Sequence, residues 1–193
     1  MSNLVDKGYV ELVPKGDIQR ADGAVWYLPH HPVHNPRKPD KLRVVFDCAA
    51  TYNGTSLNDH VLQGPDLTNK LLGVLLRFRR EPIELMADIQ EMFHQVKVPL
   101  EDRDFLRYLW WPGGDFNMRP EVYRMTAHLF GGTWSPSCCN YVLRHTATEK
   151  EISTSPGTNN TVLGNFYVDD CLTSTETEEE AIVLTKELET LLH

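Results

Sequence analysis

The sequence predicts an α+β fold with a largely antiparallel sheet. Segments with apolar residues at helical spacing interleave with short strands rich in β-branched and aromatic residues. Several strands follow one another directly through tight turns, which favours antiparallel pairing over the parallel sheet of an alternating chain. With 193 residues, the chain has room for one large domain or two small subdomains that share a core.

The first half of the chain predicts a loop, two strands and a helix. Residues 28–40 carry four prolines and three histidines, a composition that indicates an extended surface loop rather than a metal site. The run 42–47 (LRVVFD) predicts a strand. Apolar spacing over 67–79 predicts a helix that Pro82 ends, and 83–88 (IELMAD) predicts a short strand that closes on an acid.

The second half continues with strands and ends in helices. Residues 100–111 predict a helical turn that leads into a strand, and 122–126 a further strand. Ser135 can cap a helix over 135–150, with Pro136 at its first position.

The C-terminal part predicts a loop, a hairpin and a last helix. Residues 153–160 (STSPGTNN) read as a polar loop. The runs 162–168 and 171–174 then flank two acids as a tight hairpin. In 175–193, acids suit a helix N-terminus, and we expect one face to be buried. That face comprises Ala181, Leu184, Leu188 and Leu191.

Composition excludes a membrane-spanning protein, since no apolar run approaches the roughly 18–20 residues needed. We therefore expect no membrane partner and an intracellular location, cytoplasmic or nuclear. The four cysteines include no C-x-x-C pair, which favours buried thiols in a reduced compartment over a zinc site.

The net charge of -8 lies entirely in the last 45 residues. Residues 1–148 contain 17 basic and 17 acidic side chains, and their positive charge forms two clusters. These clusters comprise Arg37, Lys38, Lys41 and Arg43, and Arg77, Arg79 and Arg80. Phosphate contacts act over about a Debye length, roughly 8 Å, so local clusters matter more than the sum. A nucleic-acid partner is therefore compatible with the sequence.

Three carboxylates follow apolar strands: Asp88 ends one, and Asp169 and Asp170 come directly after another. A carboxylate in an apolar run is costly to bury unless it is paired or binds a cation. At strand ends, the three could face a cleft and hold two Mg²⁺ for phosphoryl transfer. They could instead cap a turn and form a polar hairpin tip, and they would equally fit a metal-dependent nuclease.

Four segments, in order, resemble the motifs of reverse transcriptases. Tyr167-Val168-Asp169-Asp170 is similar to the Y-x-D-D box, and Asp88 with Phe93 five residues on is similar to the first catalytic motif. Residues 130–136 (FGGTWSP) resemble the F-G-x-x-x-[SA]-P box, and 42–47 resemble the fingers strand. The strings WYLPHHPV, LRVVFDCAATYNGTSLND, VLLRFRREPI, ADIQEMFHQV and FYVDD resemble the BEL/Pao class of long-terminal-repeat retrotransposons.

The resemblance implies part of a right-hand polymerase. Residues 1–82 would form the fingers, with 1–25 left unassigned, and 83–193 the palm, whose antiparallel sheet packs on helices. It also implies RNA-directed DNA polymerisation with two Mg²⁺, which Mn²⁺ can replace. The partners would be an RNA or DNA template with its primer, and dNTPs.

The resemblance further implies roles for single residues. Asp88, Asp169 and Asp170 would be the catalytic, metal-binding carboxylates. Arg43 would contact the triphosphate, because a planar guanidinium suits phosphate oxygens. Phe93 would lie under the sugar, where its bulky ring would exclude a 2′-hydroxyl and so favour dNTPs. The full nucleotide-binding set would be Arg43, Lys41, Ile89, Phe93, Phe130 and Gly131. The template and primer would meet Gln63, Gly64 and Tyr167.

In the family that the chain resembles, further elements follow the helix that comes after the Y-x-D-D box. The primer grip and thumb are expected to be absent, so the chain would be a piece of a Pol polyprotein. Its remaining partners would then be the thumb, RNase H, protease and integrase domains. Two alternatives stay open: a non-catalytic remnant that at most binds nucleic acid, and a metal-dependent nuclease.

Overall fold

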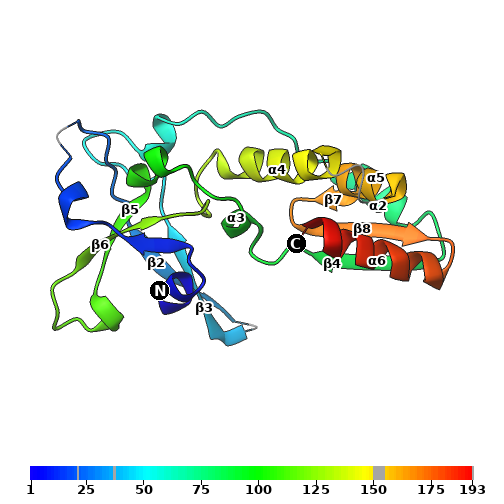
Figure 1. Cartoon of the computed structure of the whole chain (residues 1–193), viewed down its shortest axis with the longest axis horizontal. Helices are drawn as coiled ribbons and strands as arrows, with labels where there is room; N and C mark the ends of the chain where they lie inside the picture. Colours follow the sequence, from blue (N-terminus) through cyan, green and yellow to red (C-terminus); the bar gives the residue numbers. More distant parts are fainter. Residues whose placement is uncertain (21, 37, 150–154, 193) are drawn as a thin grey trace. The chain divides into compact units, whose positions relative to one another are not determined.

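The computed structural model describes residues 1–20, 22–36, 38–149 and 155–192. Two compact units make up the chain, and each is assembled from two stretches of sequence (Figure 1). The first unit contains residues 1–63 and 93–135, and the second contains 64–92 and 136–193. These boundaries differ from the predicted division at residue 82, and the assignment to fingers and palm stays a prediction.

The first unit is built on two antiparallel sheets. One sheet has the order β1-β6-β5, and the other is the hairpin β2-β3. Its strands are β1 (Val10–Leu12), β2 (His30–Asn35), β3 (Lys38–Phe46), β5 (Arg107–Trp110) and β6 (Glu121–Met125). Its helical elements are α1 (Ser2–Asp6), η1 (Lys15–Asp17), η2 (Leu57–Asp59), η3 (Leu100–Leu106) and η4 (Pro112–Gly114), with most of α3 (Met92–Gln95).

An apolar cluster fills the first unit, as expected where several short strands each turn one apolar face inward. Its buried members are Val10, Leu28, Phe46, Cys48, Leu57, Val98, Leu106, Tyr108, Met125 and Leu129. His30 joins this cluster through ring contacts to Phe46 and Tyr108, and burial lowers its pKa.

The expected surface loop at 28–40 is wrong in one respect: residues 30–35 form strand β2 and residues 38–40 begin strand β3, while residue 37 lies outside the described residues. The backbone of β2 is extended, as the prolines require, but it pairs with β3, with Pro32 opposite Val44. The backbone N–H of Asp47 also donates to the carbonyl of Pro29. A proline is tolerated here because, among the described residues, β3 is the one strand that pairs with β2; the other side of β2 is open, so the missing N–H breaks no ladder bond.

The second unit is an antiparallel sheet of order β4-β8-β7 with helices packed on it. Its strands are β4 (Ile83–Asp88), β7 (Phe166–Tyr167) and β8 (Asp170–Thr175). Its helices are α2 (Leu71–Phe78), α4 (Ser135–Glu149, from residue 136 onward), α5 (Pro156–Asn165) and α6 (Glu178–Leu192). Figure 1 shows α6, in red, running along β4 and β8.

Several predicted elements of this unit are confirmed. Strand β4 has the predicted bounds, and α4 covers the described part of 135–150. Helix α6 buries Leu188 and Leu191 and partly buries the other two residues of its predicted face.

The predicted helix at 67–79 begins later than expected, at Leu71. Tertiary contacts hold the preceding residues extended: the carbonyl of Leu67 accepts from the guanidinium of Arg144, and Asn69 donates to the carbonyls of Leu163 and Phe166. These bonds replace the first helical turn.

The segment predicted as a loop (153–160) and the start of the predicted hairpin strand (162–165) are also corrected. Within the described residues, they form helix α5. The Ser155 side chain caps its N-terminus by accepting from the backbone of Thr158, and Pro156 occupies the first helical position. Strand β7 is consequently only two residues long, and residues 153 and 154 lie outside the described residues. None of the described helices is long and apolar enough to cross a membrane.

Candidate active site

Strand β4 carries Asp88 at its C-terminal end on an exposed face. Successive strand residues point to opposite faces, so Leu85 and Ala87 share one face and Met86 and Asp88 the other. The first face lies toward α6, with Leu85 partly buried and Ala87 exposed, whereas Met86 on the other face is 71% exposed. The alternation therefore directs the Asp88 carboxylate away from the core of the unit.

The turn between β7 and β8 carries the other two acids. Tyr167 pairs with Asp170, so only Val168 and Asp169 make the turn. Val168 has φ of 58°, in the left-handed region that a β-branched residue rarely adopts. Such a conformation costs about 1–3 kcal/mol and persists only where the surroundings impose it. Val168 is therefore a strained residue within the candidate site.

Strand register brings the three carboxylates together. Asp88 lies directly opposite Asp170 in the β4–β8 pair, and the backbone N–H of Ile89 donates to the carbonyl of Asp169 at 3.0 Å. One carboxylate oxygen from each acid lies within 4.8 Å of the others. Burial, together with the charges of Asp169 and Asp88, raises the pKa of Asp170. Three like charges so close repel one another unless a cation or proton neutralises them.

The donor set of this cluster fits Mg²⁺. It offers only carboxylate oxygens, the ligands that hard divalent cations prefer, and no imidazole or thiolate of the kind that selects zinc. Asp88 and Asp170 are exposed, so waters can complete the coordination shell that Mg²⁺ usually keeps. Chemically, the cluster can hold divalent cations at the edge of a sheet.

The residues expected to meet the nucleotide lie mostly in the first unit. Arg43 is exposed on β3, opposite Val33; Lys41 lies on the same strand, and its side chain is outside the described residues. Phe93 is half-buried, and its ring meets that of Phe130 edge-on at 4.6 Å. Ile89 belongs to the second unit, next to Asp88.

The two glycines predicted to meet nucleic acid have structural reasons of their own. Gly131 has φ of 107°, and a Cβ there would collide with the carbonyl oxygen of Phe46. Asn58 fixes this turn by donating to the carbonyl of Gly131. Gly64 also has positive φ and lies against the Ser137 side chain. Both glycines therefore allow close packing of the chain on itself.

The other two residues predicted to meet template and primer are Gln63 and Tyr167. Gln63 is exposed at the end of the first stretch of the first unit. Tyr167 is partly buried in β7, one residue before the strained Val168. Their contacts with nucleic acid stay predictions.

Sequence reasoning missed a buried ion cluster in the first unit. Asp104 accepts hydrogen bonds from Arg107, Arg124 and Arg20, at 2.8–2.9 Å. Burial alone would raise the pKa of Asp104, but these three guanidinium groups outweigh it and hold the pKa well below its usual range. The sequence carried one signal for this cluster, an Asp and an Arg three apart (104 and 107) at the end of a helical turn.

Comparisons with known proteins bear on the fold alone. No family model matches the chain, and no curated protein matches it. Solved structures of foamy viral protease-reverse transcriptase do match. The complex with double-stranded DNA of the form named dRH has a TM-score of 0.69 and 18% identity, over 98% of this chain and 27% of that one. The complex with an RNA/DNA hybrid has a TM-score of 0.66 and 18% identity, over 99% and 21%.

A further foamy viral complex with double-stranded DNA has a TM-score of 0.67 at 19% identity, over 99% of this chain and 33% of that one. The chain thus spans about a fifth to a third of the proteins it matches. The chain therefore has a reverse-transcriptase-like fold.

Proposed function

We propose that this chain is the fingers-and-palm part of an RNA-directed DNA polymerase, and that Asp88, Asp169 and Asp170 are its metal-binding carboxylates. The observation that carries the proposal is the convergence of three carboxylates within 4.8 Å. It occurs in a fold similar to that of reverse transcriptases whose structures contain DNA or an RNA/DNA hybrid.

In this proposal the residues of the second unit act as a rigid holder. Strands β4 and β8 fix two of the acids opposite each other, and the strained turn at Val168 presents Asp169 beside them. Two Mg²⁺ held there would activate the primer 3′-hydroxyl and neutralise charge at the dNTP α-phosphate. The ordered motifs and the strings similar to BEL/Pao retrotransposons support a retrotransposon Pol polyprotein as the source.

In the first unit, Arg43 and Lys41 would hold the triphosphate and Phe93 would exclude ribonucleotides. Phe93 is half-buried, so part of its ring is open to a ligand, and its edge-on contact with Phe130, another residue of the predicted nucleotide-binding set, supports the ring. Phe93→Ala is expected to raise incorporation of rNTPs relative to dNTPs. An unchanged ratio would remove Phe93 from this role.

Primer extension on an RNA template with Mg²⁺ and dNTPs tests the central proposal. We expect wild-type chain to extend the primer and Asp88→Asn to lose more than about 100-fold in rate, since losing a metal ligand costs more than the 10–100-fold typical of its supporting residues. Glu84→Gln is the matched control, because Glu84 is an exposed acid on the same face of β4, four residues earlier. Equal losses in both variants would contradict the assignment.

A binding measurement separates the metal site from turnover. Mn²⁺ should broaden the backbone NMR signals around residues 88 and 169–170 at low occupancy, and Asp169→Asn should weaken this effect while Glu84→Gln does not. Shortened primers in place of extended ones would favour the nuclease. Salt-sensitive duplex binding without extension, together with intact Mn²⁺ binding, would favour the non-catalytic remnant.

A further inference from the structure

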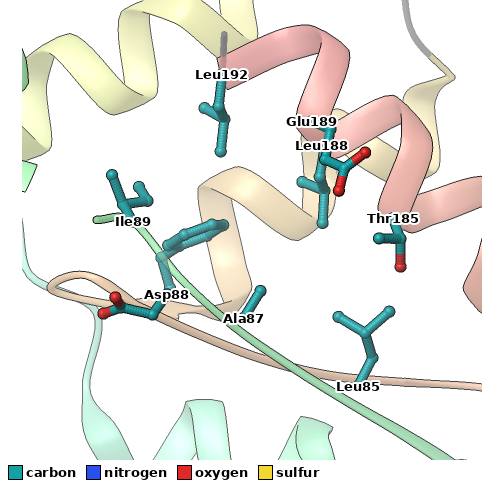
Figure 2. A pocket seen from close by; sticks show the side chains of 9 residues that line it. Leu85, Ala87, Asp88, Ile89, Thr185, Leu188, Glu189 and Leu192 are labelled. Atoms are coloured by element: carbon teal, nitrogen blue, oxygen red, sulfur yellow. The ribbon is translucent and has the colours of Figure 1, made fainter.

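A partly open cavity of about 150 Å³ lies between β4 and α6, within the second unit (Figure 2). Its walls are almost entirely apolar. The residues that line it are Leu85, Ala87, Asp88, Ile89, Phe166, Thr185, Leu188, Glu189 and Leu192. None of them was singled out from the sequence for a role at such a cavity.

The cavity results from a mismatch in side-chain size. The small Ala87, which is itself exposed, lies between the partly buried Leu85 and Ile89, so it leaves a gap that is open to solvent. Thr185 of α6 borders this gap, and its hydroxyl donates to the carbonyl of Ala181 rather than to anything in the cavity. A water needs two to four polar partners, so an apolar cavity of this kind holds water poorly.

We infer that this cavity binds a small aromatic amine, with the ring between β4 and α6 and the ammonium group at Glu189. Its volume is similar to that of apolar cavities that accept benzene, which sets the size of the ring. Glu189 is the exposed carboxylate on the α6 side of the opening, and it favours a cation over a neutral or anionic substituent.

The proposed ligand would lie on the face of β4 opposite the candidate active site. In Figure 2 the Asp88 carboxylate points away from Leu85 and Leu188, as strand alternation requires. A bound ring would touch Ala87 and Ile89, the two neighbours of Asp88, and leave the carboxylate accessible. The inference therefore goes beyond the proposed polymerase activity, and binding can be measured whether or not the chain extends a primer.

Titration of the full chain with benzylamine, followed by backbone NMR, tests this inference. We expect a dissociation constant on the order of 1 mM, with signal changes at Leu85, Ala87, Ile89 and Leu188. Benzyl alcohol should bind about 2- to 5-fold more weakly, because it lacks the charge. Glu189→Gln should abolish that difference, and Glu179→Gln, another exposed acid of α6, should preserve it.

Two threonines of α6 provide a matched pair. Thr185 and Thr190 are both exposed and each donates to the carbonyl four residues earlier at 2.8 Å, but only Thr185 lines the cavity. Thr185→Leu should weaken benzylamine binding at least about 10-fold by filling the space, and Thr190→Leu should not. Ala87→Val fills the same space from the strand and should act like Thr185→Leu.

The inference is overturned if benzylamine leaves the signals of Leu85, Ala87 and Ile89 unchanged in the wild-type chain. It is overturned equally if the Thr185→Leu and Ala87→Val variants, shown to be folded by their NMR spectra, bind benzylamine as tightly as wild type does. Binding of methylamine as tightly as benzylamine would also refute it, because the ring would then contribute nothing.

Discussion

Replacing Asp104 with alanine is expected to destabilise the first unit by about 3–5 kcal/mol, because two buried guanidinium groups lose their shared carboxylate. The Asp104 side chain is 4% exposed, and those of Arg107 and Arg124 are 0% and 8% exposed. Both pairs have nitrogen–oxygen distances of 2.8–2.9 Å. Neither arginine can move into water without disturbing the strand that carries it.

The hydrogen bonds that Arg107 and Arg124 keep in Asp104→Ala determine how large the loss of stability is within the range of about 3–5 kcal/mol. Arg107 keeps the carbonyls of Asp17 and Ile18, and Arg124 keeps Glu11 at 2.7 Å. We therefore expect the lower part of the range for Asp104→Ala. Asp104→Asn should cost about half as much, because its amide oxygen still accepts hydrogen bonds although the charge is gone.

Urea unfolding followed by tryptophan fluorescence measures the loss of stability in the first unit, since all four tryptophans lie in its residues, 1–63 and 93–135. With a slope of about 1–3 kcal/mol per molar urea, the midpoint should fall by roughly 2 M. Asp102→Ala is the control, because Asp102 is exposed in the same helical turn, η3. If Asp104→Ala unfolds within about 0.5 kcal/mol of Asp102→Ala, the buried cluster does not stabilise the unit as argued.

Three local features and one acid-stability effect give the remaining predictions. The depressed pKa of Asp104 means that its stabilisation is fully present above the unfolded-state pKa, near 3.8, and is lost as pH falls from there toward the lower folded-state pKa. The difference in stability between wild type and Asp104→Ala should therefore stay constant from pH 7 to about pH 5 and be smaller, but still present, at pH 3. Gly131→Ala should cost at least about 1–3 kcal/mol in urea unfolding, because φ is positive and the new Cβ would meet a β3 carbonyl. Val168→Gly should raise the thermal midpoint of the second unit, as glycine relieves the left-handed strain; a lower midpoint would show that the valine side chain contributes more by packing than its backbone costs. Ellman's reagent should react fastest with Cys138, which is only partly buried although burial raises its pKa too, since the other three thiols are buried and burial raises the pKa of each to about 12; two or more equally fast thiols would contradict this.

The sequence by itself determined those elements whose signals are local. The short apolar run that follows Pro82 and closes on an acid at Asp88 predicted the bounds of strand β4, and helical spacing predicted the buried leucines of α6. It also placed Asp88, Asp169 and Asp170 at strand ends, from which their convergence could be suspected. The ordered motifs pointed to a reverse transcriptase, and the fold agrees with that resemblance at the level of architecture.

Only the tertiary structure decided features that depend on a distant partner. Residues 67–70 have helical spacing, but bonds from Arg144 and to the carbonyl of Phe166 hold them extended. A proline-rich run became strand β2 because β3 offered a partner, and a polar run became α5. The buried position of Asp104 is equally invisible in its local sequence.

The same division applies within the candidate site. The sequence supplied three acids, but the β4–β8 register placed Asp88 opposite Asp170, and a two-residue turn strained at Val168 set Asp169 beside them. The cavity behind β4 likewise exists only because α6, distant in sequence, lies along that strand. Strand propensity is a property of neighbouring residues, whereas register and packing minimise the free energy of the whole unit and therefore appear only once all of its segments are in contact.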